Sequence, residues 1–240
     1  MANTVPQFTS PVGRLLSGSV GEQEATNDSN GVQKLKDGVP MFHHRVTVAF
    51  PKGRENHWGE TPWGAAIMAV GYEAFPGGQC NKPDFAWKVL DGDSTIPNAR
   101  GKIPAQQVGH AGHWVVTFKT NFAPQAVNAN GTQPVPANQF YRGCYVQVHA
   151  TLAGNKSTQS PGVYLNHDIV AFAGHGEQIN TGADASECGF GQDPLPQGAS
   201  QTPIGGMAQG PQGGPAQGYP QQGPQGGPAQ PYYGAMQNNR

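Results

Sequence analysis

The chain is poor in cysteine and in charged side chains, and both shortages exclude classes of protein. Its three cysteines, Cys80, Cys144 and Cys188, are widely spaced and form no Cys-x-x-Cys pair. Neither a zinc knuckle nor a secreted disulfide framework is therefore expected, and a reducing cytosol is the simplest setting. Charged residues make up only 12% of the 240 residues, and the formal net charge is −1. The chain as a whole is thus not a basic protein.

Long apolar runs and the common nucleotide-binding and hydrolase motifs are also missing. No stretch approaches the roughly 20 apolar residues of a membrane span, and the first residues lack the basic and apolar segments of a signal peptide. The chain contains neither the phosphate-binding Gly-x-x-x-x-Gly-Lys-Ser/Thr motif nor Gly-x-Ser-x-Gly, which mark two large groups of enzymes. We expect no membrane association, no enzymatic activity and no cofactor.

Eight histidines raise the alternative of a metal site. Only His110 and His113 have the spacing of metal ligands, and Gly109 and Gly112 beside them indicate a loop. No nearby carboxylate or cysteine pair completes a tetrahedral ligand set. We therefore expect no structural metal.

Glycine and proline are concentrated near the C-terminal end and divide the chain into three parts. From Pro194 onward no charged residue occurs before Arg240, and the octapeptide Gly-Pro-Gln-Gly-Gly-Pro-Ala-Gln stands at 210–217 and again at 223–230. Such a sequence buries too little apolar surface to offset its ordering entropy. We expect a disordered tail over 194–240, which serves either as a spacer or for weak self-contacts. We expect residues 1–40, which are polar and weakly periodic, to form a mobile N-terminal arm, and residues 41–193 to form the folded domain.

The pattern of apolar residues in the remaining body predicts a mainly β fold. Alternation of apolar and polar side chains predicts strands over 43–50, 113–120, 140–150 and 161–172, with a shorter strand over 85–90. Thr61 and Pro62 have the types expected at the start of a helix, and this helix is expected to end near 76–78. Residues 123–138 are predicted to form a loop. Several short strands and one helix favour a small closed or partly open barrel with a helical insertion.

The predicted strand over 140–150 has two different faces. Its even positions, including Cys144 and Val146, are apolar, whereas its odd positions carry Tyr141, Tyr145 and His149. Successive side chains point to opposite faces of a strand, so one face is expected in the core and the other in water. Exposed rings beside cations form a surface on which unpaired bases can stack.

Several segments in the same order resemble the OB-fold single-stranded-DNA-binding proteins of tailed bacteriophages. They are Arg45-Val46-Thr47-Val48-Ala49-Phe50-Pro51-Lys52, Leu90-Asp91-Gly92-Asp93, Gly109-His110-Ala111-Gly112-His113-Trp114-Val115-Val116, Tyr141-Arg142-Gly143-Cys144-Tyr145-Val146 and Gly162-Val163-Tyr164-Leu165-Asn166. The resemblance covers roughly residues 42–190. It implies an OB-fold, which is a small Greek-key β-barrel, and a protein that coats and protects single-stranded DNA during phage replication, recombination or repair. It further implies self-association along DNA, contacts with phage replication proteins and a location in the cytoplasm of an infected bacterial host.

A protein that binds unpaired strands of any sequence needs cations for the phosphates and flat rings for the bases. The candidate nucleic-acid-binding residues are Arg45, Lys52, Arg54, Trp58, Lys102, Lys119, Tyr141, Arg142, Tyr145, Lys156 and Tyr164. Four other large aromatic residues are expected in the core: Trp63, Trp87, Trp114 and Phe118.

Two other functions remain open from the sequence. One is a phage structural or assembly protein whose β-domain associates with copies of itself and binds no nucleic acid. The other is a small hydrolase or nuclease that uses histidines and aspartates. The first predicts regular assemblies without affinity for DNA, and the second predicts metal dependence and product formation.

Overall fold

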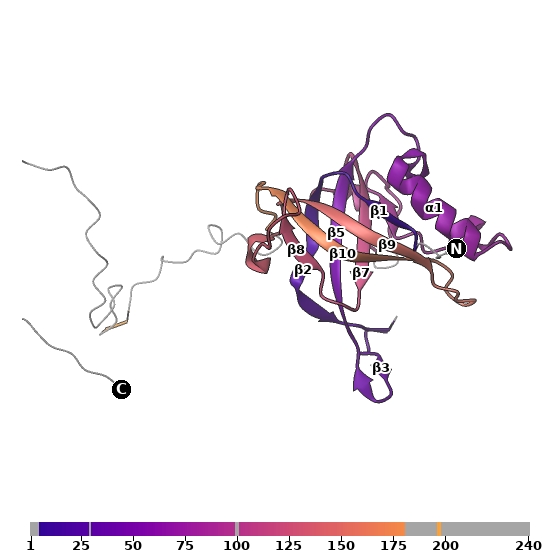
Figure 1. The fold of residues 1–240 in the computed structure, drawn as a ribbon, viewed down its shortest axis with the longest axis horizontal. Coiled ribbons are helices and arrows are strands. Elements are labelled where there is room, and N and C mark those ends of the chain that lie inside the picture. Colours follow the sequence, from indigo (N-terminus) through magenta and orange to yellow (C-terminus); the bar gives the residue numbers. More distant parts are fainter. Residues whose placement is uncertain (1–4, 29, 99–100, 181–195, 198–240) are drawn as a thin grey trace, which may run out of the picture. The chain divides into compact units, whose positions relative to one another are not determined.

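A computed structural model describes residues 5–28, 30–98, 101–180 and 196–197 of the chain (Figure 1). The chain divides into two compact units, Met1–Glu187 and Cys188–Arg240. The first unit holds the fold, and the expected tail over 194–240 lies outside the described residues apart from 196–197. No helix in the described part is both long and apolar enough to cross a bilayer.

Within the described residues, the first unit is a curled antiparallel and parallel sheet with one α-helix. The main sheet contains β1 (Gln7–Thr9), β2 (Gly13–Ala25), β5 (Phe42–Pro51), β6 (Val89–Asp91), β7 (His113–Thr120), β8 (Gln125–Asn128), β9 (Tyr145–Gly154) and β10 (Val163–Gly174). A separate hairpin is formed by β3 (Leu35–Lys36) and β4 (Val39–Pro40). The helices are α1 (Pro62–Ala74) and the short 3₁₀ turns η1 (Trp58–Glu60), η2 (Gln79–Asn81), η3 (Pro104–Gln106) and η4 (Ala137–Gln139).

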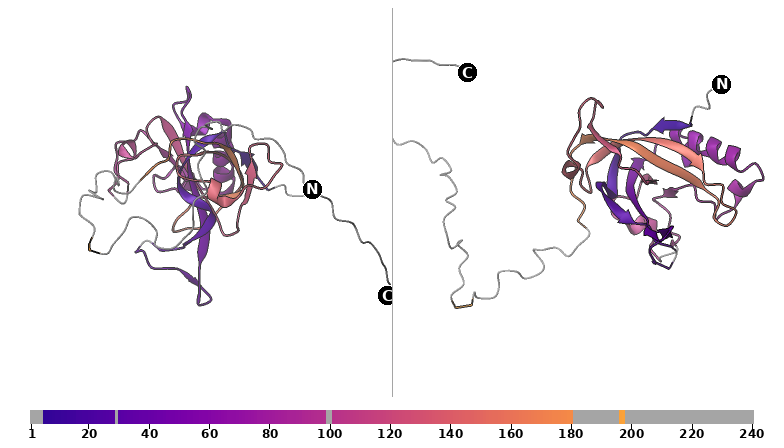
Figure 2. Two further views of the ribbon diagram at one scale, coloured as in Figure 1. Left: turned by 90° about the vertical axis from the view of Figure 1, so that its left-hand side faces the viewer. Right: turned by 60° about the horizontal axis from the view of Figure 1, so that its bottom comes forward.

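The strands of the main sheet wrap around a common interior (Figure 2). Their order is β6-β7-β5-β2-β9-β10-β8, and β1 also pairs with β9. All pairings are antiparallel except that of β8 with β10. β7 and β10 come close to each other without forming a ladder, so the barrel is only partly closed there, by an isolated bridge between Ala86 before β6 and Gly162 before β10. The hairpin of β3 and β4 projects away from the barrel (Figure 1).

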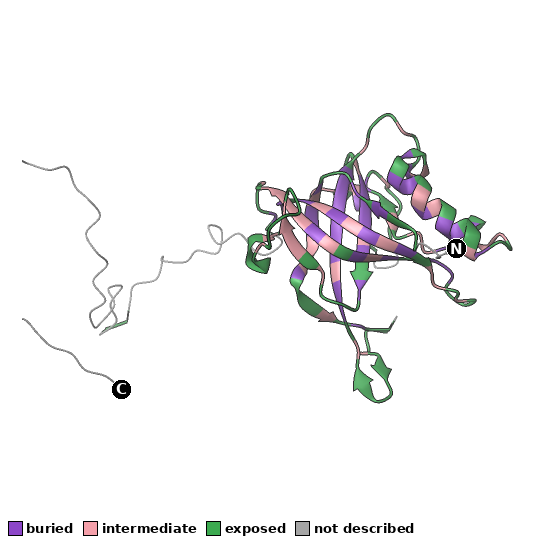
Figure 3. Cartoon of the chain, in the orientation of Figure 1, coloured by how far each residue is buried: buried purple, intermediate pink, exposed green. Residues whose placement is uncertain are grey.

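The core follows the alternation that predicts the strands. Buried and accessible residues alternate along β9 and β10 (Figure 3). On β9, Val146, Val148 and Ala150 are fully buried, whereas the residues between them face outward. Trp114 and Phe118 of β7 are also in the core, as predicted. The expectation of a mainly β fold is confirmed.

The predicted helix is present and begins where the sequence indicates. The Thr61 side chain accepts a hydrogen bond from the Gly64 N–H at 3.0 Å, and Pro62 is the first helical residue. This cap satisfies one of the N–H groups that a helix leaves without an internal partner. Trp63 and Ile67 face the core, and α1 lies against β1 and β9. The helix is therefore an insertion that covers one part of the barrel.

The expectation of a mobile arm over residues 1–40 is wrong for residues 7–25. This segment forms β1 and β2, and Leu15 and Val20 are buried in the main core. Gly18 interrupts the alternation, since it has φ of +91° and lies where a Cβ would approach the Arg45 carbonyl oxygen to 1.9 Å. The register between β2 and β5 also shifts at two places. The bulges and glycines of β2 explain why its periodicity is weak although the strand is central.

Two smaller predictions about strands also need correction. The predicted loop over 123–138 contains β8, a strand of four residues that pairs in parallel with β10. The predicted strand over 85–90 is displaced, because the structure places β6 at Val89–Asp91. Both strands lie at edges of the sheet, where short strands carry little periodic signal.

One buried histidine makes stability depend on pH. His167 of β10 is 1% exposed, and neither ring nitrogen has a hydrogen-bond partner. Burial, with a smaller effect of the nearby His44, lowers the pKa of His167 from 6.5 to about 4. Between these two pH values the unfolded chain binds a proton that the folded chain does not. The free energy of unfolding is therefore expected to fall by up to about 3 kcal/mol as the pH falls from 6.5 to 4.

Urea denaturation at a series of pH values measures this effect. The variant His167→Leu should reduce the dependence between pH 6.5 and 4, because it removes the group whose pKa burial lowers most. The exposed His175 supplies the matched control, and His175→Gln should keep the slope of the parent protein. An unchanged slope in His167→Leu would mean that other groups cause the acid sensitivity.

Candidate nucleic-acid interface

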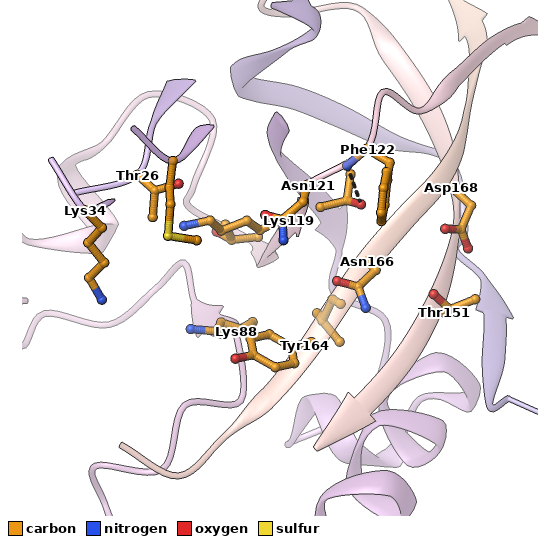
Figure 4. Close-up of a pocket in the computed structure, with 14 residues that line it drawn as sticks. Thr26, Lys34, Lys88, Lys119, Asn121, Phe122, Thr151, Tyr164, Asn166 and Asp168 are labelled. Atoms are coloured by element: carbon orange, nitrogen blue, oxygen red, sulfur yellow. Dashed lines mark hydrogen bonds between the residues drawn. The ribbon is translucent and has the colours of Figure 1, made fainter. Parts of the chain in front are cut away.

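An open groove with a volume of about 770 Å³ lies where β7 and β10 face each other without pairing (Figure 4). Its walls come mainly from the approach to β3, the approach to β6, the end of β7 and the first half of β10, with single residues just after β2, just before β5 and on β9. We call it the β7–β10 groove and define it by the lining residues Lys34, Lys88, Lys119, Asn121, Phe122, Tyr164 and Asn166.

Three lysines meet in this groove. Lys119 stands on β7, Lys88 immediately precedes β6, and Lys34 immediately precedes β3 (Figure 4). Loss of hydration lowers the pKa of Lys119, and the positive charges of Lys88 and Lys34 lower it further. Loss of hydration also lowers the pKa of Lys88. The two lowered pKa values mean that the charged ammonium is disfavoured in the protein alone, and the repulsion of Lys119 by Lys88 and Lys34 is relieved when an anion binds.

The groove lysines are not neutralised by neighbouring carboxylates. Among the described residues, none of the three forms an ion pair. Asp168 also lines the groove, but at the end away from the lysines, beside Thr151 (Figure 4). It lies 3.9 Å from the His149 ring nitrogen Nδ1. The groove therefore has a cationic end and an acidic end, which gives a bound polyanion a preferred placement.

Two exposed rings accompany the lysines. Phe122 follows the end of β7 and is 81% exposed, and Tyr164 near the start of β10 is 50% exposed. A large aromatic side chain left so open to water forgoes the stabilisation that burial provides. The amides of Asn121 and Asn166 line the groove between them (Figure 4). Rings for stacking and amides for hydrogen bonding are the groups that contact unpaired bases.

Arg45 lies next to the groove, but its charge is already paired with the carboxylate of Glu24. It pairs with Lys119 across the β5–β7 ladder, and its guanidinium donates two hydrogen bonds to Glu24, at 2.8 and 2.9 Å. These bonds lower the pKa of the Glu24 carboxyl group. The Arg45–Glu24 pair therefore lies beside Lys119 and contributes little net charge to the groove.

Of the eleven residues that the sequence suggests for the interface, the structure brings Lys119 and Tyr164 together in the groove. Sequence reasoning missed Lys34, Lys88 and Phe122. Lys88 has a positive φ of 63°, which turns the chain there before β6 begins and takes the residue out of the predicted strand. Phe122 and Lys34 stand in segments without alternation. For Phe122 the sequence offers one signal, which is an aromatic residue just after the predicted strand over 113–120.

The structure does not place Trp58 at the interface that the sequence suggests. It is 7% exposed, and its ring lies in the core among Trp63 and Trp87, at centroid distances of 6.4 and 5.4 Å. The polar residues around it in the sequence belong to a 3₁₀ turn that points the indole inward. Trp58 is therefore a core residue and cannot present its ring to a ligand.

Lys52 is held in a structural cluster. Its ammonium binds the carboxylates of Asp91 and Asp93 and lies 4.2 Å from the centroid of the Trp114 ring. Although partial burial disfavours the charge, these two carboxylates raise the pKa of Lys52. The arrangement ties the end of β5 to the turn after β6, so Lys52 is already paired. The remaining predicted loop cations, Arg54, Lys102 and Lys156, are exposed and do not line the groove.

Tyr141, Arg142 and Tyr145 lie at the other end of the β9–β10 ladder. Tyr145 pairs with Gly174, whereas Tyr164 pairs with Ala153. At about 3.3 Å per strand residue, the two rows are about 26 Å apart. The predicted interface is thus divided into the groove and a second, separate cluster.

The histidines do not assemble with other ligands in the part of the chain that the structure describes. No group of three or more His, Cys, Asp or Glu side chains there could hold a metal ion. His110 and His113 lie in and after a turn.

Comparison with known proteins identifies relatives. A model of the family described as "Enterobacter phage Enc34, ssDNA-binding protein" matches residues 59–199. No curated protein sequence matches the chain. Among solved structures, the single-stranded DNA-binding protein from bacteriophage Enc34 is similar with a TM-score of 0.50 and 14% identity, over 77% of this chain and 90% of that one. This similarity supports the OB-like barrel.

Two further solved structures match with lower TM-scores. The Enc34 protein in complex with single-stranded DNA gives a TM-score of 0.48 at 14% identity, over 73% of this chain and 90% of that one. The single-stranded DNA-binding protein gp2.5 encoded by bacteriophage T7 gives 0.42 at 16% identity, over 77% and 99%. Because the family match covers more than half of the chain, this protein belongs to the family of the single-stranded-DNA-binding protein of Enterobacter phage Enc34.

Proposed function

We propose that this protein binds single-stranded DNA of any sequence in the β7–β10 groove and protects it during phage replication, recombination or repair. The observation that carries the proposal is the meeting of three unpaired lysines with two exposed rings in one groove. Membership of a family described by single-stranded-DNA binding supports the same function. A structural or assembly protein without affinity for DNA has no use for such a groove.

The charges of the groove suggest how a strand lies in it. Phosphates occupy the end that holds Lys34, Lys88 and Lys119, where they replace the counterions that surround free DNA. Bases extend toward Phe122 and Tyr164, since every base has a face that can stack on a ring. The acidic Asp168 at the opposite end repels phosphates and so limits the path of the backbone.

The same arrangement favours single strands over duplexes. Stacking on Phe122 or Tyr164 requires a base whose face is free, and the bases of a duplex are stacked on each other. The groups expected to meet the strand are three lysines and two rings, which contact phosphates and base faces of any sequence. Binding is therefore expected to depend on strandedness and salt, and only weakly on sequence.

Titration of a fluorescent oligonucleotide, followed by anisotropy, tests this function. We expect tight binding to a single-stranded thymidine oligonucleotide, much weaker binding to a duplex of the same length, and a steep loss of affinity as salt rises. A preference for duplex, or binding that is independent of salt, would contradict the proposal. Assemblies that form without DNA affinity would favour the structural alternative.

Three finer proposals rest on the sequence of the tail and on the resemblance to phage proteins. The protein acts in the cytoplasm of an infected bacterial host, associates with copies of itself along DNA, and contacts phage replication proteins. If the tail serves self-association, a chain that ends at residue 193 should bind short oligonucleotides with unchanged affinity but lose cooperativity on long strands. Binding curves on short and long single strands compare the two chains, and equal cooperativity would refute a role of the tail.

A further inference from the structure

A cluster of rings and arginines stands about 26 Å from Tyr164 of the groove, at the far end of the β9–β10 ladder. We call it the distal platform and define it by the residues Arg14, Tyr141, Arg142, Tyr145 and His175. Tyr145 is 41% exposed. The rings of Tyr141 and His175 are nearly parallel, at 20°, with centroids 6.0 Å apart.

Backbone hydrogen bonds and close packing at two glycines hold the platform residues in place. The Tyr141 hydroxyl donates to the Gly176 carbonyl oxygen at 2.9 Å and accepts from the Gly176 N–H at 3.1 Å. A Cβ at Gly176 would approach the Tyr145 ring to 2.9 Å, and a Cβ at Gly143 would approach the Glu177 carbonyl oxygen to 1.9 Å. The two glycines thus let residues 174–177 pack closely on residues 141–145. Rings fixed in this way lose little conformational entropy when a ligand binds.

The platform also carries positive charge. Arg14 pairs with Tyr145 across the β2–β9 ladder, and its guanidinium donates to the Glu177 carbonyl oxygen at 2.7 Å. A carbonyl group is a neutral acceptor, so this bond does not cancel the charge of Arg14. Arg142, which directly follows Tyr141, is exposed. Two arginines next to accessible tyrosine rings fit a phosphate-linked chain of bases better than an apolar protein surface.

A polar strip joins the platform to the groove. The outward positions of β9 between Tyr145 and the groove residue Thr151 are Gln147 and His149, and all of them are at least partly accessible. β9 and β10 are paired along this whole length. Asp168 stands beside this strip and repels phosphates, so a single strand that leaves the groove can follow β9 and β10 to the platform only with its phosphates turned toward the solvent.

We propose that the distal platform is a second contact for the same DNA strand, so that one molecule binds a longer segment than the groove alone can hold. The proposal rests on the function proposed for the groove. It predicts two ranges of oligonucleotide length, within the roughly 4–16 nucleotides that single OB-folds occupy. Oligonucleotides of about 5 nucleotides fill the groove only, and those of about 15 nucleotides reach both contacts.

The test compares the parent protein with Arg142→Ala/Tyr145→Ala on thymidine oligonucleotides of these two lengths. We expect unchanged affinity for the short oligonucleotide and at least a tenfold loss for the long one, from one stacked base and one phosphate contact. Unchanged binding of the short oligonucleotide also shows that the variant is folded. The variant Tyr72→Ala, which removes an exposed ring from α1, should bind both lengths as the parent does.

Each other outcome has a defined meaning. Equal affinity of the double variant and the parent for the long oligonucleotide would overturn the proposal and assign the platform to a different partner, such as a protein. An equal loss on both lengths would place the short strand on the platform and also overturn it. If the parent protein binds neither length, the function proposed for the groove fails as well.

Discussion

Replacing both Phe122 and Tyr164 with alanine is expected to weaken binding of short single-stranded DNA by between about 30-fold and 10⁴-fold. Stacking of one base on one ring contributes about 1–3 kcal/mol, and the variant removes both rings of the groove. The salt dependence should stay as in the parent protein, because a neutral ring releases no counterions. Fluorescence anisotropy at several salt concentrations measures both quantities.

The exposure of the two rings makes this variant informative. Phe122 is 81% and Tyr164 50% exposed, so their removal should change the free energy of unfolding by less than about 0.5 kcal/mol. The control is Tyr72→Ala, which removes a comparably exposed ring outside the groove. Equal affinity of the Phe122→Ala/Tyr164→Ala variant and the parent would show that bases do not stack in the groove.

Replacing Lys88 and Lys119 with alanine is expected to change the salt dependence instead. Each phosphate neutralised on a single strand contributes about 0.7 to the slope of the logarithm of affinity against the logarithm of salt concentration. Loss of two contacts should therefore reduce the slope by about 1.4, and the loss of affinity should be greatest at low salt. The double variant should not be destabilised, since it removes the loss of hydration and the repulsion by Lys88 that lower the pKa of Lys119.

The control for this variant has the same net charge. Lys82 and Lys102 are exposed and lie outside the groove, so Lys82→Ala/Lys102→Ala should leave the slope nearly unchanged. If the salt dependence falls equally in the two double variants, the overall charge of the protein explains it, and the groove lysines contribute no more than other lysines.

The alternation of side chains was sufficient to predict most of the strands, the helix and much of the core. It correctly separated Trp114 and Phe118 from the surface, because each shares a strand face with other apolar residues. It failed on β2, whose bulges and Gly18 break the period of two. Period-based reasoning detects regular strands, and a strand that is strongly bent around a barrel is not regular.

The groove was harder to predict than the fold. Lys119 and Tyr164 stand on regular strands, so their outward direction follows from the sequence. Lys34, Lys88 and Phe122 stand on irregular segments, and their meeting depends on the absence of pairing between β7 and β10. Trp58 shows the opposite error, since polar neighbours in sequence do not place a side chain in water when a 3₁₀ turn directs it inward.

Photo-crosslinking of a short oligonucleotide that carries 5-iodouracil measures most directly where the bases lie. A length of about 5 nucleotides restricts the oligonucleotide to one contact, and mass spectrometry identifies the aromatic residues that have reacted. Binding in the β7–β10 groove predicts crosslinks to Phe122 and Tyr164. Crosslinks to Tyr141 and Tyr145 alone, or to residues remote from both surfaces such as Tyr72, would contradict the central claim that the groove holds the single strand.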